Sequence, residues 1–219
     1  MYAKTIGAAV AAGLLSLAGG FANASVTVVS NSSAMTVYQD RAAFTAASAR
    51  VFTDSFDDLG FGDLGPVLPR TIGAATYTVA AGDGLFGTGG LTDRYISTTF
   101  PDSTLLFAGF SPDARGFGGN FFGADENGVP VRASSIDVTV VDATGTLVLS
   151  IDNSSATDFV GFLSSVQIQA AVFSGESDRY YPTINDVAVA LAPVPEPGTY
   201  AMLLAGLAVL PFATRRRPT

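Results

Sequence analysis

The sequence contains no cysteine, no histidine and no tryptophan, and its single lysine is Lys4. Without cysteine and histidine, the chain has no disulfide, no thiol nucleophile, no Ser-His-Asp triad and no zinc site built from these ligands. The absence of lysine beyond residue 4 also excludes a lysine nucleophile from the rest of the chain. Paired carboxylates are the catalytic chemistry that remains, and we expect a protein that is not an enzyme.

Basic residues are also scarce between the two ends of the chain. From Ser25 to Glu196 there are seven arginines against nineteen acidic residues, which is a net charge of −12 for that span. Nucleic acid phosphates require a basic surface, so nucleic acid is not expected as a partner. The acidity is compatible with divalent cations, with neutral sugars, or with solubility alone.

Residues 1–24 have the pattern of a secretory signal peptide. Lys4 forms a short positive region, residues 6–18 are apolar, and Ala22-Asn23-Ala24 forms an A-x-A cleavage site before Ser25. The apolar run is shorter than the roughly 20 residues that a membrane-spanning helix needs. The pattern therefore predicts cleavage before Ser25 and export through the inner membrane.

The end of the chain, residues 192–219, combines three features in order. These are Pro195-Glu196-Pro197, an apolar run over 200–213, and the basic cluster Arg215-Arg216-Arg217. The prolines favour an extended spacer, the apolar run is able to enter a bilayer as a helix, and the arginines favour retention on the cytoplasmic side. As a helix the run would be about 21 Å long against a hydrocarbon core of roughly 30 Å, which suits a transient membrane anchor.

This tail resembles the PEP-CTERM sorting domain of Gram-negative bacteria. The resemblance implies recognition and processing by an exosortase, a membrane protease-transpeptidase of bacteria that make extracellular polysaccharide. It also implies a location in the cell envelope, on the outer surface or in the extracellular matrix. An ordinary membrane anchor behind a proline-rich stalk is the alternative.

Residues 25–191 have the composition and pattern of an all-β domain. The span is rich in Gly, Ser, Thr, Val, Ala and Phe, and short alternating apolar runs are separated by turn signals. Asp40 is expected to cap one short helix over 41–49. Glycines and prolines predict a loop over 60–73. Together these features predict an antiparallel β-sandwich of roughly ten strands.

Local patterns add three expectations. Residues 135–142 alternate, and the turn Ala143-Thr144-Gly145 leads into residues 146–151, which predicts a hairpin. The alternating Phe and Gly over 115–123 predict a strand whose rings pack where the facing backbone lies close. The alternation of the last strand, residues 183–190, slips at Asp186, which predicts a β-bulge.

Several segments of this span resemble a jelly-roll domain common in PEP-CTERM proteins. The segments are 38–44, 56–58, 117–122, 159–162 and 183–187. The resemblance implies a lectin-like architecture without a defined activity.

Oxygen-bearing side chains at the two ends of this domain are candidates for a calcium site. Calcium favours carboxylate and amide oxygens. The first and last strands of jelly rolls often lie side by side, so Asp57 or Asp58 would approach Asn185 and Asp186. This set resembles the structural calcium site of many carbohydrate-binding sandwiches. Calcium is the one cofactor that we consider.

Sugar binding would use exposed aromatic faces, for which Tyr95, Tyr180 and Tyr181 are the candidates. Paired acids would be able to cleave a glycoside, and the obvious acids are Asp57, Asp58, Asp125 and Glu126.

From the sequence as a whole we expect an exported envelope or matrix protein with a structural or adhesive role that is associated with exopolysaccharide. A calcium-dependent carbohydrate-binding module is the alternative, and a glycoside-cleaving enzyme is the third hypothesis.

Overall fold

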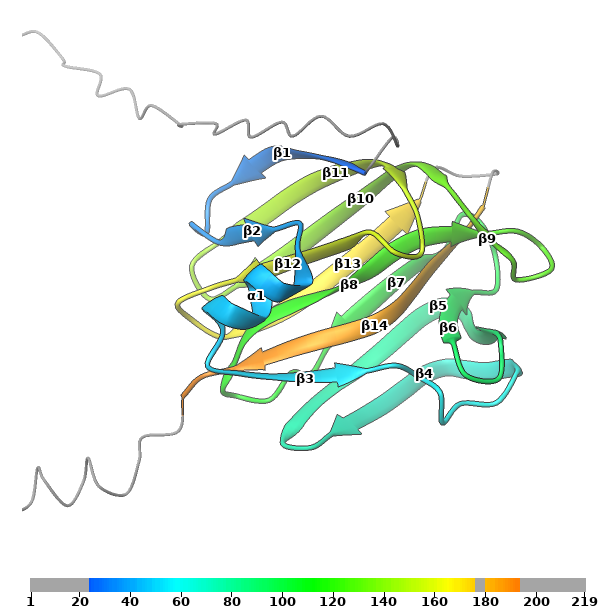
Figure 1. Ribbon diagram of the computed structural model, residues 1–219, viewed down its shortest axis with the longest axis horizontal. Coiled ribbons are helices and arrows are strands. Elements are labelled where there is room, and N and C mark those ends of the chain that lie inside the picture. The colour runs from blue at the N-terminus through cyan, green and yellow to red at the C-terminus, as the bar shows by residue number, and fades with distance from the viewer. Residues whose placement is uncertain (1–23, 176–179, 194–219) are drawn as a thin grey trace, which may run out of the picture.

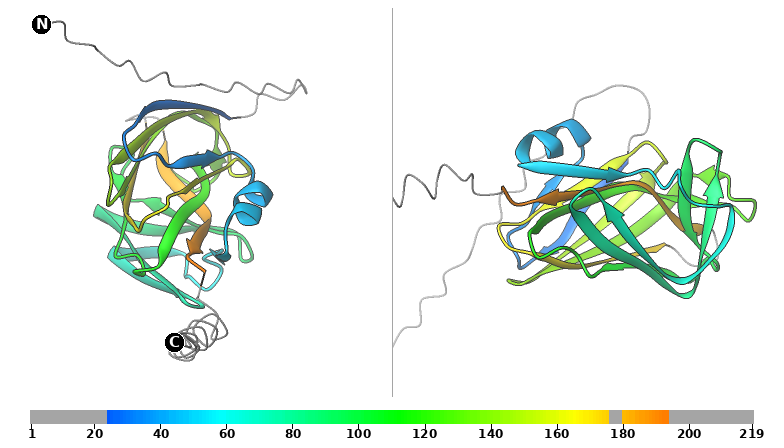
Figure 2. Two further views of the ribbon diagram at one scale, coloured as in Figure 1. Left: turned by 90° about the vertical axis from the view of Figure 1, so that its left-hand side faces the viewer. Right: turned by 90° about the horizontal axis from the view of Figure 1, so that it is seen from below.

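The computed structural model describes residues 24–175 and 180–193. These residues form one antiparallel sheet that curls into two layers, with one short helix on its outer face (Figure 1; Figure 2). The predicted all-β class with a short helix near the start of the domain is confirmed. Residues 1–23 of the predicted signal peptide and the predicted C-terminal helix lie outside the described residues.

The helix is α1 (Arg41–Ala47). The strands in chain order are β1 (Ser25–Asn31), β2 (Thr36–Tyr38), β3 (Arg50–Asp54), β4 (Gly62–Ile72), β5 (Ala75–Gly89), β6 (Arg94–Thr98), β7 (Thr104–Ala108), β8 (Ala114–Ala124), β9 (Pro130–Val131), β10 (Ala133–Asp142), β11 (Thr146–Ser154), β12 (Phe159–Leu163), β13 (Ile168–Gly175) and β14 (Tyr181–Leu191).

The strand order is β1-β11-β10-β13-β7-β5-β6-β14-β8-β12-β2, with β3 added to β14, β4 to β5 and β9 to β8. The long strand β5 pairs with β7 through residues 78–80 and with β6 through residues 85–89. The sheet turns at this strand, so that β8 packs across the core against β10, β11 and β13. Figure 2 shows the two layers that result.

Aromatic rings form the centre of the core. The ring centroids of Phe107 and Phe117 are 4.9 Å apart, and those of Phe121 and Phe173 are 5.3 Å apart. All four rings are buried. Phe117 and Phe121 both belong to β8, so the predicted Phe-Gly strand supplies the middle of the core.

On the outer face of β8, glycine makes room for α1. The helix begins where predicted, because the Asp40 carboxylate accepts the Ala43 backbone N–H at 2.7 Å. Phe44 of the helix is fully buried, with its ring centroid 5.5 Å from that of Phe159. A Cβ atom on Gly118 would lie 2.8 Å from the Phe159 ring and 2.7 Å from the Cα of Gly161. The predicted close approach of ring and backbone is confirmed.

The predicted loop over 60–73 is wrong, because residues 62–72 form β4. The glycines that suggested a loop instead allow a bulged strand. Gly62 and Gly65 have φ angles of 119° and 75°, and the register shifts on both sides of Gly65. β4 pairs only with β5 in the described part of the chain, so Pro66 and Pro69 lie on an edge strand, where a missing N–H is tolerated.

The predicted hairpin over 135–151 is confirmed as β10 and β11, and its turn is organised by Asp142. This carboxylate is 3% exposed. Its Oδ1 atom accepts the backbone N–H groups of Thr144 and Gly145 at 2.7 and 2.9 Å. Its Oδ2 atom accepts the hydroxyl of Ser164 at 2.6 Å, which ties the hairpin to the turn after β12.

We expect Asp142→Asn to destabilise the protein at neutral pH and to reduce its acid sensitivity. Burial by itself raises the pKa of Asp142, but the hydrogen bonds from Ser164, Thr144 and Gly145 outweigh burial and hold the pKa below its usual value. The stabilisation is complete above the unfolded pKa of about 3.9 and is lost as the pH falls through the lower folded pKa. Removal of the carboxylate should lower the free energy of unfolding by about 1–3 kcal/mol at pH 7.

Urea unfolding at pH 7 and at about pH 3 measures both effects. Asp137→Asn, an exposed change on β10, is the matched control. If the variant and the wild type lost stability equally on acidification, Asp142 would not be the group responsible.

Candidate functional site

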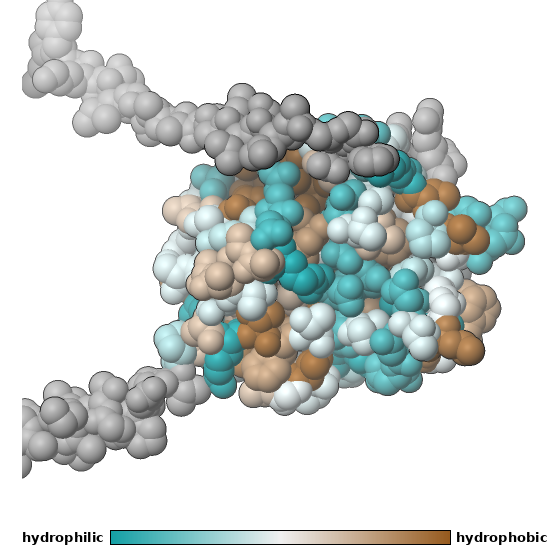
Figure 3. Space-filling model, in the orientation of Figure 1, coloured by the Kyte–Doolittle hydropathy of each residue, from teal (hydrophilic) through white to brown (hydrophobic). Residues whose placement is uncertain are grey.

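A polar groove lies on the outer face of the sheet, where β8, β12 and β14 run side by side next to the start of α1. Its volume is about 1010 Å³. Its walls come from residues 39–41, from residues 156–160 and from Asn120, Asn185 and Asp186, with Asp93 also lining it. Figure 3 shows hydrophilic side chains gathered over this part of the molecule.

A β-bulge directs Asp186 into the groove. Asn185 pairs with Asn120 and Ala188 pairs with Gly118, so two residues of β14 lie opposite the single residue between them. Asp186 adopts a φ angle of 49°, and the next residue, Val187, remains fully buried in the core. The predicted bulge is confirmed, and its effect is to turn a carboxylate outwards from the centre of a sheet.

A chain of hydrogen bonds fixes the polar groups on the floor of the groove. An Nη atom of Arg41 donates to the Oδ1 atom of Asn120 at 3.3 Å and to the backbone carbonyl of Asp186 at 2.8 Å. The amide of Asn120 donates to the Oδ1 atom of Asn185 at 3.0 Å, and Asn185 donates to Asp93 at 3.1 Å. The two asparagines are 7% and 5% exposed. The side chains that line the floor are therefore held in defined directions.

The charges of the groove act against one another. Burial raises the pKa of Asp186, and the nearby carboxylates of Asp93 and Asp57 raise it further, although the cation of Arg41 opposes this. Burial lowers the pKa of Arg41, and the charge of Asp186 partly restores it. The Arg41 guanidinium also lies 4.5 Å from the centre of the Phe159 ring. The groove thus combines one positioned cation with several acceptors.

Three of the four residues predicted for calcium lie near the bulge, and the fourth, Asp58, is engaged elsewhere. Asp57 lies close enough to Asp186 to influence its pKa, and Asn185 precedes Asp186 on the bulge. Asp58 is instead held by Arg70, with a shortest distance of 2.6 Å. Within residues 24–175 and 180–193, no three acidic side chains are grouped as a metal site. Calcium binding by Asp57, Asn185 and Asp186 stays a prediction.

Two of the three tyrosines predicted to present exposed faces are buried, which corrects that expectation. Tyr95 is 7% exposed, packs edge-on against Phe122 at 5.1 Å and donates its hydroxyl to Asp93 at 2.7 Å. Tyr180 is 3% exposed and donates its hydroxyl to the Ser135 carbonyl. Its ring lies over Gly123, where a side chain would block it.

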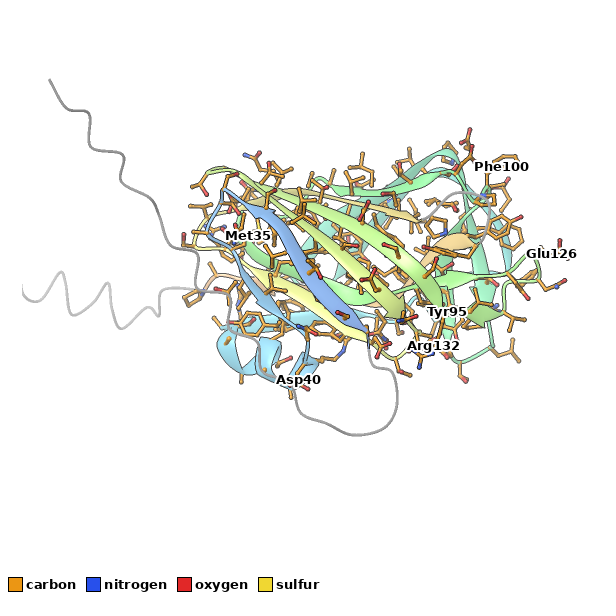
Figure 4. All side chains as sticks on the ribbon, turned by 90° about the horizontal axis from the view of Figure 1, so that it is seen from above. Met35, Asp40, Tyr95, Phe100, Glu126 and Arg132 are labelled. Atoms are coloured by element: carbon orange, nitrogen blue, oxygen red, sulfur yellow. The ribbon has the colours of Figure 1, made fainter. Side chains whose placement is uncertain are left out.

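The third tyrosine, Tyr181, is half-buried and lines a smaller pocket with Asp125 and Glu126. Asp125 is occupied by its own turn, because it accepts the backbone N–H groups of Asn127 and Val129. Figure 4 shows Glu126 and Phe100 at one end of the sandwich, away from Asp40 and α1. Of the acids considered for glycoside cleavage, Asp58 is thus held by Arg70 and Asp125 by its own turn.

Residues 193–217 match the family model of the PEP-CTERM protein-sorting motif. This chain carries a PEP-CTERM motif. The match confirms the resemblance of the tail and indicates an exported protein that is processed by an exosortase and delivered across the inner membrane to the cell envelope. No curated protein and no solved structure matches the chain.

The PEP-CTERM motif follows the sandwich directly, because β14 ends at Leu191 and the match begins at residue 193. The sorting residues Pro195, Glu196 and Pro197 and the cluster Arg215-Arg216-Arg217 lie outside the described residues. Among the residues that are described, no helix is long and apolar enough to cross a membrane.

Most residues that line the groove were not predicted as site residues, among them Arg41, Asp93 and Asn120. Asn120 had a signal in the sequence, since it is the one amide in the Phe-Gly run and would face outwards from a strand whose rings fill the core. Arg41 and Asp93 had none, because only the pairing of distant segments brings them to the bulge.

Proposed function

We propose that this exported protein has a structural or adhesive role in the extracellular matrix, and that the groove at Asp186 binds a neutral polysaccharide. The observation that carries the proposal is the hydrogen-bonded array of Arg41, Asn120 and Asn185 beside the bulge. Binding, and not catalysis, is the activity that we assign to it.

The groups of the groove suit a sugar. Amide and carboxylate side chains together donate to and accept from hydroxyls, and groups that are fixed in advance lose little conformational entropy on binding. The carboxylates of Asp40, Asp93, Asp158 and Asp186 line the groove together with the single cation Arg41. This excess of negative charge favours a neutral polysaccharide over an acidic one.

The placement of Asp186 also supports a functional role. A partly buried carboxylate near two others, in a left-handed backbone conformation, is unfavourable for folding. Perturbed acids of this kind concentrate at functional sites. A contact between Asp186 and a ligand would explain why the protein keeps a carboxylate that is unfavourable for folding.

We expect Asp186→Asn to weaken polysaccharide binding by about tenfold without destabilising the fold. Asparagine accepts the positive φ angle, but it replaces an acceptor oxygen by a donor. Because the folded pKa of Asp186 is raised, the wild type gains stability as the pH falls through that pKa, and the variant should lack this gain. At pH 7 the variant should be at least as stable as the wild type.

Titration calorimetry with the extracellular polysaccharide of the producing cells measures the affinity, and urea unfolding measures the stability. Asp102→Asn, an exposed change in the turn before β7, is the control. Unchanged affinity in Asp186→Asn would refute the assignment of the groove. Affinity that requires added calcium would favour a calcium-dependent module, and release of reducing ends would replace binding by hydrolysis.

A further inference from the structure

The last strand of the sandwich is held on both sides up to its final residue. Leu191 pairs with Arg50 of β3 and with Ala114 of β8. The next backbone N–H, that of Ala192, donates to the carbonyl of Asp113 at 2.7 Å, and Arg50 donates to the Ala192 carbonyl at 3.3 Å. Fraying of β14 would break two ladders and expose Leu191, which is 2% exposed, so the chain is anchored to the sandwich through Ala192.

The connection from this anchor to the sorting residues is therefore short. Pro195 is the third residue after Ala192. An extended chain advances at most 3.3–3.6 Å per residue, so the Pro-Glu-Pro segment starts within about 11 Å of the end of the sandwich. The apolar run that begins at residue 200 starts within about 29 Å of it.

The surface around the anchor is hollowed and lined largely by small side chains. A groove of about 760 Å³ lies between the end of α1, the turn after β12 and the end of β14. Its lining includes Ala47, Ala49, Ser165 and Pro193. Figure 1 shows these three chain segments at the same end of the molecule. A second protein is thus able to approach the backbone closely at the place where the motif leaves the domain.

We infer that this groove, which we call the exit groove, is a docking surface for the exosortase. An enzyme that encloses Pro195-Glu196-Pro197 in its active site has a standard-size contact region roughly 30 Å across, which is wider than the reach of the connection. The enzyme therefore contacts the sandwich around the exit groove whenever it holds the motif. Recognition of this substrate includes the folded domain as well as the tail.

The test combines a groove-filling substitution with a longer connection. Ser165→Trp places a large ring at an exposed position of the exit groove, and a lengthened form of the full chain carries ten Gly and Ser residues between Pro193 and Val194. Processing in cells that contain the exosortase is followed by intact mass after a pulse of expression. At native spacing, Ser165→Trp should slow processing by about tenfold. In the lengthened chain it should have no effect, because the enzyme then reaches the motif without contacting the domain.

Thr92→Trp, an exposed change in the turn between β5 and β6, is the control and should leave both rates unchanged. Ala47→Trp is a second groove variant that should repeat the result, and thermal unfolding verifies that each variant is folded. Equal rates for Ser165→Trp, Ala47→Trp and wild type at native spacing would overturn the proposal. Equal slowing at both spacings would also overturn it, as would faster processing, which would mean that the groove holds the tail itself.

Discussion

Replacing Arg70 by alanine is expected to lower the free energy of unfolding by about 3–5 kcal/mol. Arg70 of β4 binds Asp54 of β3 with two hydrogen bonds of 2.7 Å each, from its Nε and one Nη atom. Asp54 is 4% exposed and also accepts the hydroxyl of Tyr77 at 2.8 Å. Without the guanidinium, a buried carboxylate remains with no cation beside it, and the contact that joins β3 to β4 is lost.

The comparison with Asp58 separates the buried pair from the exposed one. Asp58 also binds Arg70, at 2.6 Å, but its side chain is 65% exposed. Solvent weakens such a pair, so Asp58→Ala should lower the free energy of unfolding by about 1 kcal/mol or less. The stability of Arg70→Lys should fall between those of the two alanine variants, because lysine keeps the positive charge but loses the bidentate hydrogen bonding of arginine.

Urea unfolding of the purified protein measures all three variants under the same conditions. The decisive quantity is the difference between Arg70→Ala and Asp58→Ala. If the two variants lost the same stability, the pairing with Asp54 would contribute no more than an ordinary surface ion pair.

The substitution Gly118→Val is expected to lower the free energy of unfolding by about 3 kcal/mol, which is the upper end of the usual range for overpacking a core. Three atoms would lie within 2.8 Å of the added Cβ atom: the Cα of Gly161, the Cζ of Phe159 and the carbonyl oxygen of Val160. Two of these are backbone atoms of β12 and are unable to move without opening the β8–β12 pairing. Phe159 is confined in turn by Phe44, so α1 should also lose its packing against the sheet.

Gly82→Val is the matched control for this change. Gly82 lies in β5, and no atom would lie within 4 Å of its added Cβ. The control should change the stability by about 0.5 kcal/mol or less. Thermal unfolding with circular dichroism compares the two variants, and an equal shift in both would mean that general strand propensity, and not the close approach at Gly118, sets the effect.

The features that the sequence alone predicted depend on neighbours along the chain. The cap at Asp40 is a contact with a residue three positions away, and the hairpin of β10 and β11 follows from alternation around a short turn. The bulge at Asp186 is visible because the period of two breaks at one residue. The PEP-CTERM motif is likewise a linear pattern, which needs no fold to be recognised.

What the tertiary structure alone decided depends on contacts between distant segments. Local rules predict a loop over residues 60–73, whereas pairing with β5 makes residues 62–72 a strand in which glycine accommodates the bulges. The burial of Tyr95 and Tyr180 follows from which elements cover them, and alternation does not reveal this. The groove at Asp186 unites Arg41, Asn120 and Asp93 from three separate parts of the chain. A linear pattern records the chemistry of each residue, but the curling of the sheet determines which of these residues meet.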